Sequence, residues 1–227
     1  VNPYDEYALE QAVQLKEQQA GPGEVVLITV GAAHCSGALR PALAVGGDRA
    51  ILVECGELFP APRLTARALA GAIRRDGVPD LVLCGRQAVD SEGSQVPYRL
   101  AAALELPVVT EAAAMEVDGR EVRIEREIDG GRREVLQTVL PAVVTATRGL
   151  NHPRYPRLPD IIKARKKEVE TIPFEQAAGP HTAVPDGFMP GGLTQPAVVR
   201  RRHMLEGSPE QQVDELVHRL RTVEKVL

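Results

Sequence analysis

Apolar residues follow two different periods along the first two thirds of the chain. Helical spacing predicts four helices, at residues 7–18, 36–45, 63–75 and 95–104. Continuous apolar runs rich in β-branched residues predict buried parallel strands, at residues 24–30, 50–53 and 80–84. Because strands and helices alternate at this spacing, we expect an α/β fold that is doubly wound and Rossmann-like around a mostly parallel sheet.

An antiparallel excursion is expected after this α/β pattern. Residues 115–118 and 121–126 alternate between apolar and polar and flank Asp118-Gly119, a favoured hairpin turn. A second turn signal at residues 129–131 precedes a further extended stretch, and residues 142–146 return to the buried-strand pattern.

A proline-rich segment follows the last of these strands. Residues 151–159 hold three prolines in nine residues, so they suit neither a regular helix nor a central strand. We expect an extended, exposed loop there, followed by a short basic helix at residues 161–167.

The C-terminal quarter has a different composition. Residues 174–195 are rich in Gly and Pro, which indicates a linker or arm, and residues 196–200 predict a short strand. Ser208, Pro209 and Glu210 have the order of an N-cap and first turn, so they begin a last helix. Its apolar stripe must pack on its own domain or on a partner, and comprises Val213, Leu216, Val217, Leu220 and Val223. We divide the chain into an α/β domain, residues 1–173, and a C-terminal arm and amphipathic helix, residues 174–227.

Composition narrows the classes of function. The 227 residues are 44% hydrophobic but only 3% aromatic, so the core must be aliphatic, and aromatic platforms for single-stranded nucleic acid are not expected. A net charge of -4 gives no overall attraction to nucleic acid or anionic membranes, and no apolar run reaches the ~18 residues of a membrane span. Cys35, Cys55 and Cys84 have no metal-binding spacing. As unpaired thiols they indicate a reducing compartment, either the cytoplasm or the mitochondrial matrix.

No catalytic constellation is visible in the sequence. Walker A, G-x-S-x-G and H-E-x-x-H motifs are absent, and the five histidines are scattered without acidic partners at useful spacing. We therefore expect a binding or electron-carrying protein without catalytic residues of its own, rather than a group-transfer enzyme.

A glycine-containing loop follows the predicted strand at residues 80–84. Ligands of a parallel sheet bind at the carboxyl ends of its strands, and the next helix, beginning near Ser94, would direct free N–H groups to the same place. Gly85 and Gly93 permit a close backbone approach, and Ser91 and Ser94 add hydroxyl donors. These features suit a phosphate. For this loop taken alone, an ordinary βα connection with helix-capping Asp and Ser residues would be the better interpretation.

Five stretches, in the same order, resemble motifs of electron-transfer flavoprotein β subunits. They are NPYDEYALE at residues 2–10, ALAVGGDRA at 42–50, GRQAVD at 85–90, REIDGG with LPAVVT at 126–131 and 140–145, and LNHPRY with LPDIIKARKK at 150–155 and 158–167. Together they span nearly all of residues 2–167. The C-terminal arm and helix match the family in layout but hardly in residues.

The resemblance implies a nucleotide-binding electron-carrier subunit. Family members pair with an α subunit that holds most of a redox-active FAD, and the heterodimer passes electrons from dehydrogenases to a quinone oxidoreductase or another acceptor. The β subunit binds AMP in most members and a second FAD in electron-bifurcating ones. By position, adenosine contacts fall on Asn2, Pro3, Tyr4 and Asp5, a further contact falls on Val30, and the phosphate loop comprises Gly85, Arg86, Gln87, Ala88, Val89, Asp90, Ser91, Glu92, Gly93, Ser94, Gln95 and Val96.

The resemblance also implies a partner-recognition loop at residues 151–167. Leu158 matches the leucine that anchors the heterodimer in a dehydrogenase pocket, and an apolar side chain on a proline-stiffened loop costs little entropy to order. The basic run would steer acidic partners, or simply form a solvated helix face. The expected partner-binding residues are Tyr155, Leu158, Pro159, Ile161, Lys163, Arg165 and Lys166.

Two departures from the family pattern bear on the nucleotide site. The loop has DSEGSQVP at residues 90–97 where relatives have D-G-D-T-A-Q-V-G or D-D-D-C-N-Q-T-G, which leaves AMP and FAD as alternatives. Family chains also have a V-x-V-K-x-V-P strand and a hairpin ahead of the N-P-[FY]-D motif. Neither is present in this sequence, so we expect it to hold only part of the site.

Two other classes of protein remain as alternatives. A free-standing adenine-nucleotide-binding regulator of the universal-stress-protein type would share the layout, but it would be a homodimer and would not need the loop at residues 151–167. A nucleotide hydrolase or transferase would need a P-loop or a metal cluster, and the sequence shows neither motif.

Overall fold

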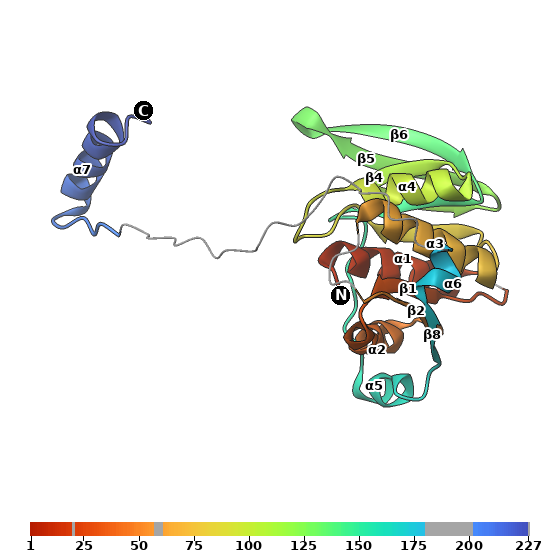
Figure 1. Cartoon of the computed structure of the whole chain (residues 1–227). Helices are drawn as coiled ribbons and strands as arrows, with labels where there is room; N and C mark the ends of the chain where they lie inside the picture. The colour runs from red at the N-terminus through yellow and green to blue at the C-terminus, as the bar shows by residue number, and fades with distance from the viewer. Residues whose placement is uncertain (20, 57–60, 180–201, 227) are drawn as a thin grey trace. The chain divides into compact units, whose positions relative to one another are not determined.

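The structure is a computed structural model that describes residues 1–19, 21–56, 61–179 and 202–226. The chain divides into two compact units, Val1–Phe188 and Met189–Leu227. Figure 1 shows the helices and strands of both units. The first unit contains the α/β pattern and both predicted sites.

Three parallel strands form one sheet of the first unit, in the order β1-β2-β8: β1 (Val26–Gly31), β2 (Arg49–Glu54) and β8 (Val169–Pro173). Helices cover both faces of this sheet, with α2 (Ser36–Val45) and α5 (Leu158–Ala164) on one side and α3 (Pro62–Asp76) and α6 (Phe174–Ala178) on the other (Figure 1). Alternate residues of β2 serve the two faces. Ile51 and Val53 pack in the cluster with α3 and α6, whereas Ala50 and Leu52 pack with α2 and α5. A strand buried on both faces is apolar at every position, which explains the continuous apolar run.

Five further strands form a second sheet in the order β3-β7-β4-β5-β6: β3 (Leu81–Gly85), β4 (Val108–Asp118), β5 (Glu121–Ile128), β6 (Arg132–Val139) and β7 (Ala142–Ala146). β3, β7 and β4 are parallel, whereas β5 and β6 are antiparallel and form the predicted excursion. The predicted α/β fold class is therefore confirmed. Among the described residues, the strands form two separate hydrogen-bonded sheets, of three and five strands, where one sheet was expected from the sequence.

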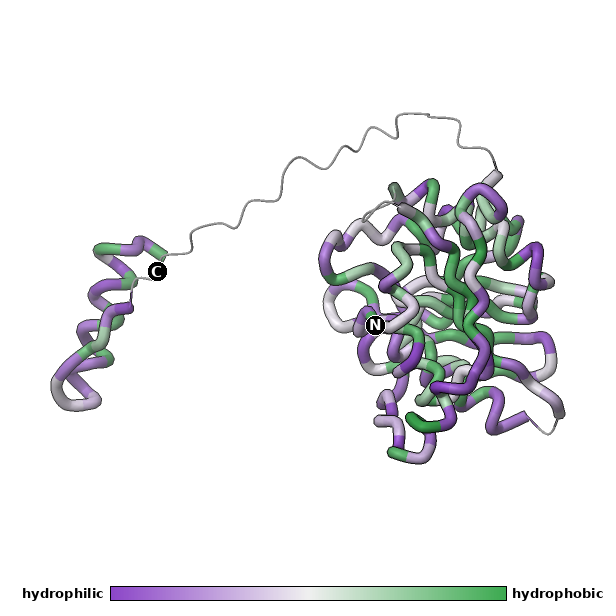
Figure 2. The backbone as a smooth tube through the Cα atoms, turned by 60° about the horizontal axis from the view of Figure 1, so that its bottom comes forward, coloured by the Kyte–Doolittle hydropathy of each residue, from purple (hydrophilic) through white to green (hydrophobic). Residues whose placement is uncertain are grey.

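Helices and the aliphatic core complete this unit. Helix α1 (Pro3–Gln18) packs beside β3, and α4 (Gln95–Leu104) packs on α3, β4 and β7. The core of the second sheet joins Val122 and Ile124 of β5 to Val144 of β7, and all three are fully buried. Figure 2 shows hydrophobic positions along the strands in the middle of the unit and hydrophilic positions on its outside.

The element boundaries correct several sequence predictions. Helix α1 begins at Pro3 instead of residue 7, because Pro suits a first helical position, where its missing N–H leaves no bond unmade. The pattern also missed β8 and the first half of β4. Residues 174–178 form α6 rather than the start of a linker, since Phe174 and Ala178 bury themselves against α3. The remainder of the expected arm at 180–195 and the strand expected at 196–200 lie outside the described residues.

The second unit contains α7 (Pro209–Thr222). Ser208 Oγ accepts a hydrogen bond from the Gln211 N–H, and the Gln211 side chain accepts one from the Ser208 N–H. This capping box confirms the predicted helix start. Val213, Leu216 and Val223 of the predicted apolar stripe are exposed within this unit.

Candidate functional site

The predicted phosphate loop lies at the carboxyl end of β3, where ligands of parallel sheets bind. It leads from Gly85 to helix α4, which begins at Gln95 as predicted. Glu92 and Ser94 in this loop have left-handed backbone conformations, with φ of 48° and 49°. The Ser94 hydroxyl donates to Gln87 Oε1 at 3.0 Å and does not cap α4. The N–H groups of Gln95 and Val96 in the first turn of α4 are therefore available to an anion, whereas Pro97 has no N–H.

The first turn of α1 holds this loop in place. Asn2 Nδ2 donates to the Gln87 carbonyl at 3.0 Å, and the Val89 N–H donates to Asn2 Oδ1 at 3.2 Å. The Asp5 carboxylate accepts a hydrogen bond from the Gly85 N–H. The structure thus brings the expected adenosine and phosphate segments together, although they lie about eighty residues apart.

Gly85 is required by this close approach. A Cβ atom at this position would lie 2.7 Å from the Cβ of Tyr4 and 2.9 Å from the backbone nitrogen of Asp5. Backbone atoms this close cannot move aside, so a side chain would separate α1 from the loop. Val30 lies near the carboxyl end of β1, where it packs against the core around Ile51.

A polar cleft of about 560 Å³ opens beside the loop. Arg86 lies between the two, with its guanidinium 5.2 Å from the centre of the Tyr4 ring and its Nη1 3.3 Å from Glu111 Oε1. Tyr98 and Thr110 contact one another through their hydroxyls at 3.2 Å. The remaining lining residues come from the end of β5 and the turn after it, namely Arg126, Glu127, Ile128 and Asp129.

Sequence reasoning did not identify Tyr98, Thr110 and Glu111 as parts of a site. Glu111 has a positive φ of 63° and lies at an irregularity in the pairing of β4 with β7, where its N–H donates to the buried Thr145 hydroxyl. Such a conformation is rare for a residue with a side chain, and it directs Glu111 toward Arg86. A bulge of this kind has no local sequence signal.

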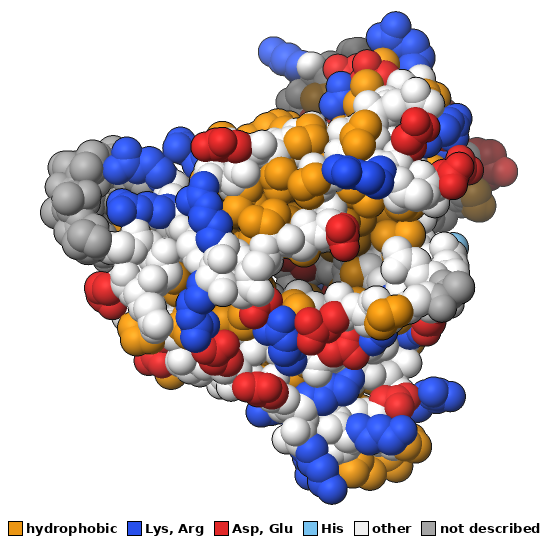
Figure 3. Space-filling view, turned by 90° about the vertical axis from the view of Figure 1, so that its right-hand side faces the viewer, with side chains coloured by type: hydrophobic (Ala, Val, Ile, Leu, Met, Phe, Trp, Pro, Cys, Tyr) orange, Lys and Arg blue, Asp and Glu red, His pale blue; other side chains and the backbone are white. Residues whose placement is uncertain are grey.

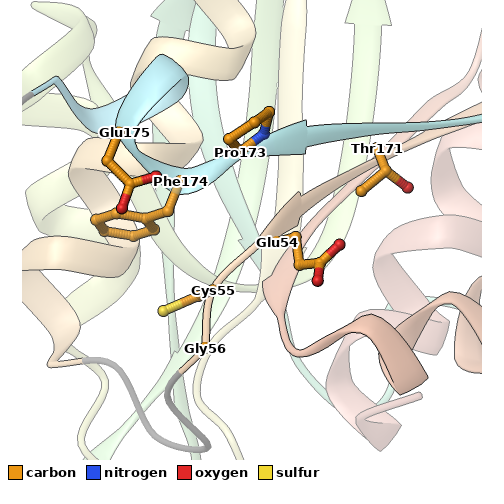
Figure 4. A pocket seen from close by; sticks show the side chains of 7 residues that line it. All are labelled: Glu54, Cys55, Gly56, Thr171, Pro173, Phe174 and Glu175. Carbon is orange, nitrogen blue, oxygen red and sulfur yellow. The ribbon is translucent and has the colours of Figure 1, made fainter.

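A second cleft, of about 530 Å³, lies at the carboxyl ends of β2 and β8. Figure 4 shows its lining residues, with Cys55 and Phe174 on one side and Glu54 on the other. The Glu54 and Glu175 carboxylates do not point toward each other there. Across the part of the chain that the structure describes, no group of three or more His, Cys, Asp or Glu residues is placed to hold a metal ion.

Cys84, which immediately precedes the phosphate loop, has an unreactive thiol. Burial, with a smaller contribution from Asp5, raises the pKa of the Cys84 thiol to about 12. Cys84 therefore stays protonated at neutral pH and lacks the thiolate that nucleophilic or redox chemistry requires.

The predicted partner-binding residues are all exposed at one end of the α/β unit. Tyr155 is 93% exposed and Leu158 is 71% exposed. The structure places Leu158 and Pro159 in the first turn of α5 rather than in the loop, because Pro at a second helical position supports an earlier start. Ile162, which the sequence reasoning left out, is also exposed beside Ile161. In Figure 3 hydrophobic side chains lie among Lys and Arg side chains at the lower end, where Figure 1 places α5.

The loop before α5 is fastened to the middle of α1. Arg154 Nε lies 2.9 Å from the Glu10 carboxylate, and its Nη1 lies 2.6 Å from Glu17. Asn151 Nδ2 donates to the Tyr7 carbonyl at 2.9 Å. Burial alone would raise the pKa of Glu10, but hydrogen bonds from Arg154 and Gln14 hold that pKa below its usual value. Glu10 is thus a buried carboxylate that remains charged.

Two cationic side chains, one near each helix, attach the end of α5 to α2. Arg40 Nη1 donates to the carbonyls of Ala164 and Lys167, at 2.9 and 2.8 Å. Lys167 Nζ donates in return to the carbonyls of Leu43 and Gly47 at the end of α2. Each cation donates to carbonyls at or just beyond the end of the other helix and interacts favourably with the dipole of that helix.

Comparisons with known proteins show which family the chain resembles. A family model described as the electron transfer flavoprotein domain matches residues 1–177. The electron transfer flavoprotein subunit beta of Bacillus subtilis is 36% identical over 234 residues, covering 100% of this chain and 88% of the relative. The proteins of the same name from Sus scrofa and Homo sapiens are each 44% identical and cover 76% of this chain and 68% of the relative.

The chain belongs to the electron transfer flavoprotein β-subunit family. The family model matches the chain only up to residue 177, within the α/β unit, whereas the alignment with the Bacillus subtilis protein covers the whole chain, α7 included. The extent of the family-model match agrees with the sequence motifs, all of which lie before residue 168. Within the described residues of this family member, no helix is long and apolar enough to cross a membrane.

Proposed function

We propose that the chain is the β subunit of a heterodimeric electron-transfer flavoprotein. In this proposal it binds AMP, or a second FAD, at the loop from Gly85 to Val96, and it pairs with an α subunit that holds most of a redox-active FAD. Residues 155–166 dock dehydrogenases, and electrons pass through FAD to a quinone oxidoreductase or another acceptor. The chain contributes no catalytic residue and works in a reducing compartment.

The observation that carries the nucleotide half of this proposal is the contact between the Asn-Pro-Tyr-Asp motif and the phosphate loop. Asn2 and Asp5 use their side chains to shape that loop, so their role is to build a binding site rather than to fill the core. Uncapped N–H groups at the start of α4 are donors of the kind that a phosphate accepts. These donors suit the phosphate of an adenine nucleotide, which the loop backbone would hold with Asn2 and Tyr4 beside the adenosine.

The difference between the two nucleotides is chemical. FAD would carry electrons, whereas AMP would have a structural role only. In either case the chain's own residues bind the phosphate, position the loop and exclude water. Asp90 and Glu92 are exposed, where water screens their charges from an anion on the backbone N–H groups.

The docking half of the proposal rests on the exposed apolar group at α5. Leu158, Ile161 and Ile162 present apolar side chains to solvent next to Lys163, Arg165 and Lys166. An apolar anchor ringed by positive charge suits a partner with an apolar pocket and an acidic rim.

Co-purification tests the proposal most directly. We expect the full chain to purify with a larger, yellow, FAD-containing subunit, and the denatured complex to release an adenine nucleotide in addition to that flavin, as identified by mass spectrometry. A complex that contains no adenine nucleotide beyond the flavin of the larger subunit would contradict the pocket assignment. A chain that purifies as a homodimer would favour the regulator of the universal-stress-protein type.

A further inference from the structure

The Glu10 carboxylate in α1 accepts several hydrogen bonds from Arg154, in the loop before α5. Glu10 is only 2% exposed, and its two oxygens accept from Arg154 Nε and Nη2, each at 2.9 Å, and from the Arg154 backbone N–H at 3.2 Å. Gln14 Nε2 adds a fourth donor at 2.8 Å. A buried charge with this many donors is fixed in position, because moving it would leave it unpaired in a low-dielectric environment.

Arg154 is therefore held through both its backbone and its side chain. Its guanidinium also binds Glu17, at 2.6 and 2.9 Å, so the fork spans two carboxylates about two helical turns apart. Pro153 and Pro156 restrict φ on either side of it. These constraints leave the segment between Arg154 and Leu158 little conformational freedom.

The other end of the segment is fixed independently. Arg40 binds the carbonyls at the end of α5, and Lys167 binds those at the end of α2. Tyr155 and Leu158 lie between these two attachments, exposed and without a role in the core. The Arg154 attachment is the nearer one to both residues along the chain.

We propose that Glu10 is a positioning residue for partner docking. Through Arg154 it holds Tyr155 and Leu158 in the exposed arrangement that a dehydrogenase binds, although Glu10 itself never touches the partner. This role rests on the proposed docking function. It also makes α1 the common support of both sites, since its first turn braces the phosphate loop.

Hydrogen–deuterium exchange of the full chain tests the attachment. In Glu10→Gln, which keeps the shape but removes the charge, we expect residues 151–157 to exchange about tenfold faster, while β7 and the phosphate loop are unchanged. The control is Glu17→Gln, which removes an exposed carboxylate from the same arginine and should change exchange in this segment less than about threefold. The double variant with Glu10→Gln and Arg154→Gln leaves no buried charge unpaired and should match the single variant. Wild-type exchange at residues 151–157 in both Glu10 variants would overturn the proposal.

Electron-transfer kinetics test the consequence. The probe is a flavin-containing dehydrogenase that reduces the wild-type heterodimer. Glu10→Gln should raise the heterodimer concentration at half-maximal rate about tenfold and leave the maximal rate unchanged, because binding is impaired and the transfer step is not. Leu158→Ala is measured alongside. If Leu158→Ala raises that concentration and Glu10→Gln does not, the positioning role alone fails. If Leu158→Ala has no effect, the docking function itself fails.

Discussion

At the scale of single residues, the two sites depend on opposite properties. The predicted phosphate loop depends on Gly85, because a residue without a side chain lets α1 approach within van der Waals distance. The proposed docking surface depends on side chains that are present but not buried, such as Leu158. A substitution of Gly85 should therefore lower the free energy of unfolding, whereas a substitution of Leu158 should lower the affinity for the partner.

Leu158→Ala should weaken docking without weakening the fold. Burial of a leucine side chain in a partner pocket contributes about 1.5–3 kcal/mol, so affinity for the dehydrogenase should fall roughly tenfold or more. The measurement is electron-transfer rate against partner concentration, with thermal unfolding of the heterodimer as the control. A large fall in melting temperature with unaltered docking would mean that Leu158 is structural.

Gly85→Ala should destabilise the chain by about 1–3 kcal/mol and release the nucleotide, because the new methyl group meets Tyr4 and the backbone of Asp5. Gly93→Ala is the matched control in the same loop, since nothing lies within 4 Å of its added Cβ and its backbone needs no positive φ. Urea unfolding of both variants gives the comparison. Equal destabilisation by the two changes would show that the close approach of α1 is not what requires Gly85.

At the scale of elements, the important relation is between a loop and the helix that follows it. The phosphate loop places the N-terminus of α4 at the carboxyl edge of the sheet, and Ser94 does not cap it. The helix dipole there favours a negative ligand, so a fixed negative side chain at the same point would compete with that ligand.

Ser94→Glu should therefore release bound nucleotide and leave docking intact. The carboxylate would occupy the N–H groups at the start of α4 in place of the phosphate and would repel it. Gln137→Glu, on the exposed strand β6, adds the same charge away from the loop and serves as control. Nucleotide content after denaturation is measured by mass spectrometry. Retention of the nucleotide in Ser94→Glu would place the phosphate somewhere other than the start of α4.

The sequence predicted elements well where one local pattern determines them. Ile51 and its neighbours in β2 are apolar throughout because both faces are buried, and Ser208 caps α7 as its position implies. Local patterns failed for α6, whose helix depends on burying Phe174 against α3, and for the left-handed Glu111 in the β4 irregularity. The same division holds for the sites. The motif positions could be read from the sequence. The ion pair of Glu10 with Arg154 joins residues 144 positions apart, so it could be identified only from the folded structure.

At the scale of the whole molecule, long-range ion pairs connect helices to loops and to a strand that are distant in sequence. Arg154 binds Glu10 and Glu17, Lys16 binds Asp48, and Arg49 binds Asp76. Asp48 and Glu10 are alike in that burial alone would raise their pKa values, whereas hydrogen bonds from their partners lower those values overall. The pKa of Asp76 is also lowered, chiefly by its hydrogen bond with Arg49.

These lowered pKa values predict acid sensitivity. A carboxyl group with a lower pKa in the folded state than in the unfolded state stabilises the fold above its unfolded value, and this contribution is lost as pH falls through the folded value. The free energy of unfolding should thus be highest near neutral pH and decline below about pH 4.5, the usual value for Glu10. Urea titrations between neutral and acidic pH measure this. Glu10→Gln should show a smaller decline, whereas an identical pH profile would mean that Glu10 titrates normally.

The isolated chain should be colourless or weakly loaded with flavin. In the proposed function most of the redox-active FAD lies in the α subunit, and this chain supplies only part of the enclosure. Visible absorbance of the chain purified without a partner is the measurement. A stoichiometric, redox-active flavin in that sample would favour a second FAD over AMP in the nucleotide site.

Helix α1 has 16 residues, so it is about 24 Å long and behaves as a single rigid piece. Asn2 and Asp5 at its start contact the loop that follows β3, whereas Glu10, five residues after Asp5, contacts the loop before α5. One residue inserted between Asp5 and Glu10 would turn every later position by about 100° about the helix axis. Arg154 would then lose its partner while the first turn kept its own contacts. The number of residues between the two attachments of α1 is therefore fixed by the positions of the two loops that it contacts.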